Sequence, residues 1–141
     1  MKTLKKALET LGRAHREILA VYLFGSEATG EASPLSDLDV AVFLDEKRVR
    51  PAKFFACQSQ LTVELMQSCR RSDVDLVLLN EATPLLAYEV ISSGSLAYER
   101  DHGRRVMFEA GALRRYFDLK PFFETARSYL RRRLKDGTYG G

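Results

Sequence analysis

Residues 21–43 read VYLFGSEATGEASPLSDLDVAVF, in which two apolar runs flank a polar segment rich in Gly, Ser, Thr and Pro. The first run ends at Gly25-Ser26, and the second opens with Asp37 and Asp39. Because successive side chains of a strand point to opposite faces, the two aspartates share one face of a predicted strand. Two such carboxylates suit magnesium, which prefers oxygen ligands and shares them with substrate phosphates. Gly25 lets backbone approach a bulky anion and Ser26 offers a hydroxyl, so the stretch predicts a phosphate site facing a metal site.

Hydrophobic periodicity predicts alternating helices and strands along the chain. We expect helices over 2–17, 51–69, 83–93, 101–120 and 122–134, and strands over 18–24, 37–44, 73–80 and 95–99. The pair Lys120-Pro121 should divide the last helical region, because the residue before proline disfavours helix. The loop after the first strand is too short for a helical crossover, which predicts an antiparallel pair. The expected fold class is α/β (α+β), a small mixed sheet with packed helices.

A third acidic strand start occurs at Asp73-Val-Asp75-Leu-Val-Leu-Leu-Asn80. Phosphoryl transfer usually needs a base or a further metal ligand beside the attacking hydroxyl. Asp73 and Asp75 share a face under period-two geometry, so their spacing allows both to point to the site.

Gly25-Ser26, ten intervening residues and Asp37-Leu38-Asp39 resemble the signature of nucleotidyltransferases related to DNA polymerase β. The phrases LFGS and SDLDVAV are similar to those of the minimal nucleotidyltransferases (MNT) in particular, and FEA, LRRYFD and a later proline near the C-terminus extend the resemblance over nearly the whole chain. The resemblance implies a polymerase β-like nucleotidyltransferase fold that ends in C-terminal helices.

The resemblance also implies the chemistry, which is transfer of AMP from ATP. Asp37 and Asp39 would hold two Mg²⁺ ions around the α-phosphate, with the terminal phosphates at Gly25 and Ser26. The family's third carboxylate lies in a phrase resembling Val-Asp-Leu-Val, which selects Asp75 as the ligand that assists deprotonation of the acceptor.

The resemblance also shows one position that departs from the family pattern, Thr29, and bears on the choice between Asp73 and Asp75. Members often carry arginine where this chain has Thr29, so weaker phosphate binding or altered loop contacts are expected. Asp73 becomes a strand-entry residue if Asp75 is the third carboxylate.

Minimal nucleotidyltransferases of this kind are commonly antitoxins paired with HEPN-domain ribonuclease toxins, and members transfer AMP to a tyrosine of the toxin. The resemblance therefore implies a HEPN-type toxin as partner and a protein adenylyltransferase as activity. Two alternatives stay open: neutralisation of a toxin by docking without catalysis, and transfer to a small molecule or an RNA end. The sequence does not decide the base of the nucleotide or the oligomeric state, a homo-oligomer included, and nucleic acid is expected only through the partner.

The 141 residues are 45% hydrophobic and 29% charged with a net charge of +3, which is typical of one globular domain with one core. We expect a single domain over 1–135, with a helical part from about 101, and a flexible tail at 136–141. No apolar run approaches the roughly 20 residues that span a bilayer and no secretory signal is visible, so a cytoplasmic location is expected.

Other features are less specific. No Walker-type phosphate loop is present, which excludes a P-loop enzyme, and Cys57 and Cys69 are expected to be reduced thiols. Basic residues crowd the C-terminal end at Arg127, Arg131, Arg132, Arg133 and Lys135. They suit a solvated helix face, an acidic partner protein, or contact with phosphates or RNA.

Overall fold

The computed structural model describes residues 2–25, 28, 30 and 37–135. Its elements in chain order are α1 (Lys2–Ala14), β1 (Ile18–Phe24), β2 (Leu38–Leu44), a 3-10 turn η1 (Pro51–Lys53), α3 (Phe54–Cys69), β3 (Val74–Leu78), a 3-10 turn η2 (Leu79–Glu81), α4 (Pro84–Ser93), β4 (Ser95–Glu99) and α5 (His102–Lys135). No described helix is both long enough and apolar enough to cross a membrane. The expected tail at 136–141 lies outside the described residues.

The four strands form one mixed sheet in the order β3-β2-β1-β4. β1 is antiparallel to β2, as expected from the short connection, and also to β4, whereas β2 and β3 are parallel. The helix α3 supplies the crossover that a parallel pair requires. The predicted α+β class with a small mixed sheet is confirmed.

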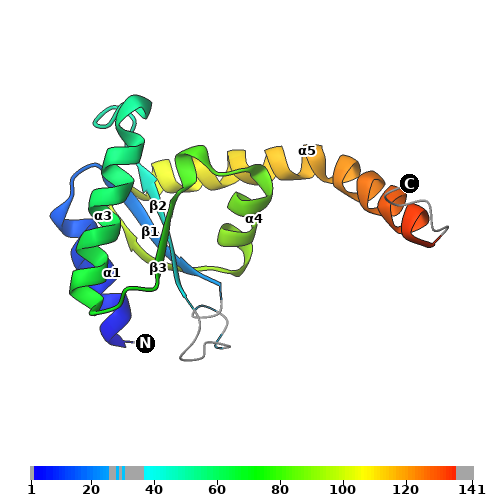
Figure 1. The fold of residues 1–141 in the computed structure, drawn as a ribbon. Helices are drawn as coiled ribbons and strands as arrows, with labels where there is room; N and C mark the ends of the chain where they lie inside the picture. The colour runs from blue at the N-terminus through cyan, green and yellow to red at the C-terminus, as the bar shows by residue number, and fades with distance from the viewer. Residues whose placement is uncertain (1, 26–27, 29, 31–36, 136–141) are drawn as a thin grey trace.

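Helices cover both faces of the sheet, with α1 and α3 on one side and α4 and α5 on the other (Figure 1). Alternate residues of β2 divide between the two cores. Val40 and Val42 pack with Leu61 and Leu65 of α3, whereas Phe43 stacks on Phe108 of α5 with ring centroids 4.3 Å apart. Burial of a large aliphatic or aromatic side chain contributes about 1.5–3 kcal/mol, so these two layers hold the sheet.

Two element ends differ from the sequence prediction. α1 ends at Ala14 because the chain turns there toward β1, and Arg100 donates hydrogen bonds to the carbonyls of Gly12, His15 and Ile18 at the turn. β3 ends at Leu78 because Asn80 bonds both the N–H and the carbonyl of Leu44 through its side chain, at 2.8 and 2.9 Å. Hydrogen bonds from the Asn80 side chain thus replace the last backbone pairing that was expected between the two strands.

The predicted break at Lys120-Pro121 is wrong, and the expected pair of C-terminal helices is the single helix α5, with Pro121 inside it. A proline removes one helical hydrogen bond and crowds the carbonyl one turn earlier. The helix nevertheless continues on both sides of Pro121, where Leu119, Lys120 and Glu124 are good helix formers. Its first half crosses the sheet, and its second half projects away from the rest of the fold (Figure 1).

Candidate active site

Asp39 and Asp75 lie side by side at one end of the sheet. The parallel register of β2 and β3 pairs Asp39 directly with Asp75, so both carboxylates point to the same face. That face is the one on which α4 and α5 pack, since Ala41 and Phe43 continue it along β2. Asp39 is partly buried and Asp75 is exposed. The predicted third strand therefore places its second aspartate, Asp75, beside Asp39 of the second strand.

The surroundings of Asp39 are strongly negative. Partial burial raises the pKa of the Asp39 carboxyl, and the negative charges of Asp75, Asp37 and Glu89 raise it further. Asp37 is exposed and stands just before β2, close enough to act on Asp39. An environment that disfavours the ionised carboxylate in the absence of a cation is one in which a cation binds favourably.

Glu89 is a member of this acidic group that the sequence reasoning missed. It projects from α4, which reads PLLAYEVISS and carries no other charged residue. Glu89 could have been noticed as the one charged residue of this helix. Its proximity to Asp39 depends on how α4 packs across the sheet, which no local pattern reports.

Gly25 follows β1 with a φ of 73°, a backbone conformation that residues other than glycine rarely adopt. A Cβ at this position would lie 2.3 Å from Oδ2 of Asp39. Phe24 pairs with Asp39 across the sheet, which brings the turn against the acid. The expected closeness of the glycine turn to the acidic strand is thus present. Ser26 and Thr29 lie outside the described residues.

Asp73 has a different environment from Asp75, although both begin the third strand. Arg71 holds Asp73 by two contacts, Nε to Oδ1 at 2.9 Å and Nη2 to Oδ2 at 2.6 Å. The hydrogen bond from Arg71 lowers the pKa of the Asp73 carboxyl. The Asp73 carbonyl also accepts the N–H of Leu38 at 2.7 Å, which aligns β3 with β2. Asp73 thus serves to join the strands, and Asp75 faces Asp39.

The donor set fits a hard divalent cation that is shared with a phosphate. Carboxylate oxygens are the ligands that Mg²⁺ prefers, and it usually keeps other positions for substrate phosphates and water. Within the described part of the chain, no group of three or more His, Cys, Asp or Glu side chains is placed to hold a metal ion by itself. The adjacent Asp39 and Asp75 carboxylates are suited to a metal that shares its other ligands with a nucleotide.

Several known structures have a similar fold. The chain is similar to a chain of a toxin–antitoxin complex with AMP-PNP, with a TM-score of 0.73 and 22% identity over 90% of this chain and 98% of the other. It is also similar to a chain of the tri-AMPylated Shewanella oneidensis HEPN toxin in complex with MNT antitoxin, with a TM-score of 0.69 and 20% identity over 92% and 98%. A chain of the MntA–HepT toxin–antitoxin gives a TM-score of 0.68 at 20% identity over 93% and 99%.

A search of curated proteins gave no match. The family model "Polymerase beta, Nucleotidyltransferase" matches residues 5–103, which is more than half of the chain and contains all the acids described above. This chain therefore belongs to the polymerase β nucleotidyltransferase family.

Proposed function

We propose that this chain transfers AMP from ATP to the hydroxyl of a tyrosine on a cognate HEPN ribonuclease toxin, and so acts as its antitoxin. The observation that carries the transfer chemistry is the Asp39–Asp75 pair, adjacent in the sheet, with the Gly25 turn against it. The catalytic unit is one domain that extends over residues 1–135.

In this proposal, Gly25 and Ser26 receive the terminal phosphates of ATP, and the absence of a side chain at Gly25 leaves Asp39 accessible. Asp75 accepts the proton of the acceptor hydroxyl on its carboxylate. The acceptor oxygen then attacks the α-phosphorus, the bond to the bridging oxygen breaks, and pyrophosphate leaves. The chain contributes mainly position and charge, which suits a site with few special residues.

Asp37, Asp39 and Asp75 would hold the magnesium of the nucleotide. Bound there, magnesium supplies charge neutralisation for the triphosphate and for the leaving pyrophosphate. The raised pKa of Asp39 supports this assignment, because the cation would relieve the repulsion among Asp39, Asp75 and Asp37.

The identity of nucleotide and acceptor is supported by what the similar structures contain. One is a toxin–antitoxin with AMP-PNP, an analogue of ATP, and another contains a HEPN toxin that is tri-AMPylated. At 22% and 20% identity, these structures show a shared fold. The nucleotide and the acceptor of this chain are therefore tested directly.

The test is transfer of label from α-labelled ATP, in the presence of Mg²⁺, to a candidate toxin. The candidate is the purified product of the gene adjacent to the one that encodes this chain. Wild-type protein should label a tyrosine of that product, and Asp37→Asn/Asp39→Asn should not. The control is Asp118→Asn/Asp101→Asn, which makes the same charge change within α5 and at the residue just before it. Equal labelling by the site variant and wild type would disprove the assignment of the acids. Binding without labelling by wild type would favour neutralisation by docking, and label on an added RNA would favour an RNA acceptor.

A further inference from the structure

The C-terminal half of α5, residues 118–135, places large apolar side chains in solvent. Phe122 is 71% exposed, Leu134 61%, Leu130 47% and Leu119 36%. In the sheet, by contrast, every residue of β1 is buried. A monomeric protein rarely leaves a contiguous apolar surface of this kind uncovered unless it binds something.

These side chains fall on one side of the helix. Residues that recur every three or four positions line one face of an α-helix. Six residues form the apolar face of α5 in this way: Leu119, Phe122, Phe123, Ala126, Leu130 and Leu134. The spacing is the one used by helices that bind in a groove of another protein.

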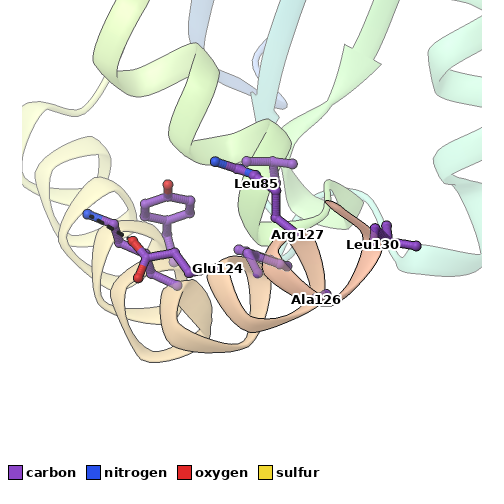
Figure 2. Close-up of a pocket in the computed structure, with 8 residues that line it drawn as sticks. Leu85, Glu124, Ala126, Arg127 and Leu130 are labelled. Carbon is purple, nitrogen blue, oxygen red and sulfur yellow. Dashed lines mark ion pairs between the residues drawn. The ribbon is translucent and has the colours of Figure 1, made fainter. Parts of the chain in front are cut away.

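The same face includes a pocket beside α4. It measures about 340 Å³ and lies between Leu85 of α4 and Tyr116, Phe123, Arg127 and Leu130 of α5 (Figure 2). Its aromatic and aliphatic lining suits an apolar side chain from outside. Lys120 also lines it, and its Nζ lies 4.0 Å from the Glu124 carboxylate, so the rim is charged.

The charge of the segment selects the chemistry of the occupant. Residues 118–135 contain six basic and two acidic side chains, a net charge of +4, whereas the whole chain carries +3. The rest of the chain thus carries −1. Among the described residues, Arg127, Arg131 and Arg132 have no ion-pair partner. Complementary potentials favour encounter and suppress wrong partners, which selects an acidic surface.

Other occupants fit less well. A second copy of this face would bring two segments of +4 together, and like charges oppose such pairing. Residues 136–141 read DGTYGG, which contains no aliphatic side chain to cover six apolar positions. RNA would use the arginines and the aromatic rings, but it gains little from Leu119, Leu130 and Leu134.

We infer that the apolar face of α5 docks into an apolar groove, bordered by acidic side chains, on the protein that accepts AMP. The inference rests on the proposed function, because it identifies the partner with the acceptor. It assigns recognition to a segment separate from the acid cluster. The chain thus holds its partner by a projecting helix, and the nucleotide by one end of the sheet.

Binding without nucleotide tests the docking independently of transfer. The probe is the purified product of the adjacent gene, titrated calorimetrically against wild type, Leu130→Glu/Leu134→Glu and the matched control Ser128→Glu/Thr125→Glu. The control puts the same charges on another side of the helix. We expect the apolar-face variant to bind at least about 100-fold more weakly and the control to stay within about fivefold of wild type. Unchanged helicity by circular dichroism would show that α5 still forms.

A second variant tests the charge. Arg131→Glu/Arg132→Glu should weaken binding about tenfold at low salt, with a smaller loss at high salt, because exposed charges are screened. Binding that is equally tight in wild type and the apolar-face variant overturns the inference, as does failure of the adjacent product to bind wild type. Three further results also overturn it: self-association of wild type that Leu130→Glu/Leu134→Glu abolishes, binding of a 20-nucleotide RNA in place of the protein, and loss of binding in the control as large as in the apolar-face variant.

The same measurements separate this inference from the function on which it rests. Loss of binding in Leu130→Glu/Leu134→Glu supports the docking face even if no label moves. Conversely, label that moves to the partner at an undiminished rate and affinity in that variant supports the transfer and removes the docking face.

Discussion

The strands at the centre of the fold and the C-terminal half of α5 use the same apolar residue types with opposite exposure. Leu38 and Leu44 of β2 are 0% exposed, whereas Leu134 is 61% and Phe122 is 71% exposed in α5. Burial in the sheet is satisfied within the chain, since α1 and α3 cover one face and α4 and α5 the other. The same side chains in α5 are covered by nothing in the described structure. Apolar patterning therefore identifies a surface that must be buried, but not what buries it.

The two regions also differ in charge. The sheet end gathers Asp37, Asp75 and Glu89 around Asp39, and their negative charges raise the pKa of its carboxyl. The end of α5 gathers arginines instead. One region is suited to cations and the other to an acidic surface, so substitutions should separate chemistry from recognition.

The largest effect is expected at the third carboxylate. Asp75→Asn should lower the rate of label transfer about 100- to 1,000-fold, because it removes a metal ligand and the group that accepts the proton. Asp73→Asn should change the rate less than about threefold, because Asp73 bonds Arg71 instead of facing Asp39. Single-turnover labelling measures both. A loss in Asp73→Asn equal to that in Asp75→Asn would contradict the assignment of Asp75.

The next effect compares the two apolar regions directly. Leu65→Ala should lower the free energy of unfolding by about 2–4 kcal/mol, because Leu65 is 0% exposed and its removal leaves a cavity. Leu134→Ala should cost less than about 0.5 kcal/mol, as surface changes usually do. Urea unfolding with equal m-values measures both. Similar losses for both variants would mean that α5 is covered within the chain.

The glycine turn should matter for activity because it lies against Asp39. Gly25→Ala should lower the transfer rate about 10- to 100-fold, because the new Cβ would meet Asp39 Oδ2 at 2.3 Å and the φ of 73° is unfavourable. Gly30→Ala is the matched control, since its φ is also positive, at 79°, but no atom lies within 4 Å of the added Cβ. If the two variants lose activity equally, backbone conformation alone explains the turn, and the approach to Asp39 does not.

The smallest effect is a dependence of stability on pH. The raised pKa of Asp39 means that the folded state binds this proton more tightly than the unfolded state, so ionised Asp39 destabilises the fold and the penalty disappears as pH falls through its folded pKa. Without Mg²⁺ at pH 7, Asp39→Asn should raise Tm by about 2 °C, and the gain should shrink toward acidic pH. Thermal unfolding with Asp118→Asn as control measures it. A gain that grows as pH falls would refute the raised pKa of Asp39.

Much of the site could be predicted from sequence because it depends on short-range rules. The alternation of side chains along a strand puts Asp37 and Asp39 on one face, and the end of an apolar run at Gly25 marks the turn. The antiparallel pairing of the first two strands follows from their short connection. The break at Lys120-Pro121 was predicted wrongly because the bias of a residue before proline is weak compared with the helix-forming residues on both sides of it.

Sequence by itself determined the strands and the acids at their starts, because each follows from residue type and period. Only the tertiary structure decided which of the third strand's acids meets Asp39, because that depends on the parallel register of β2 and β3 and on the bond of Asp73 to Arg71. It also decided that Glu89 acts on Asp39 and that Phe122, Leu130 and Leu134 of α5 stay exposed, because both depend on how helices pack over the sheet.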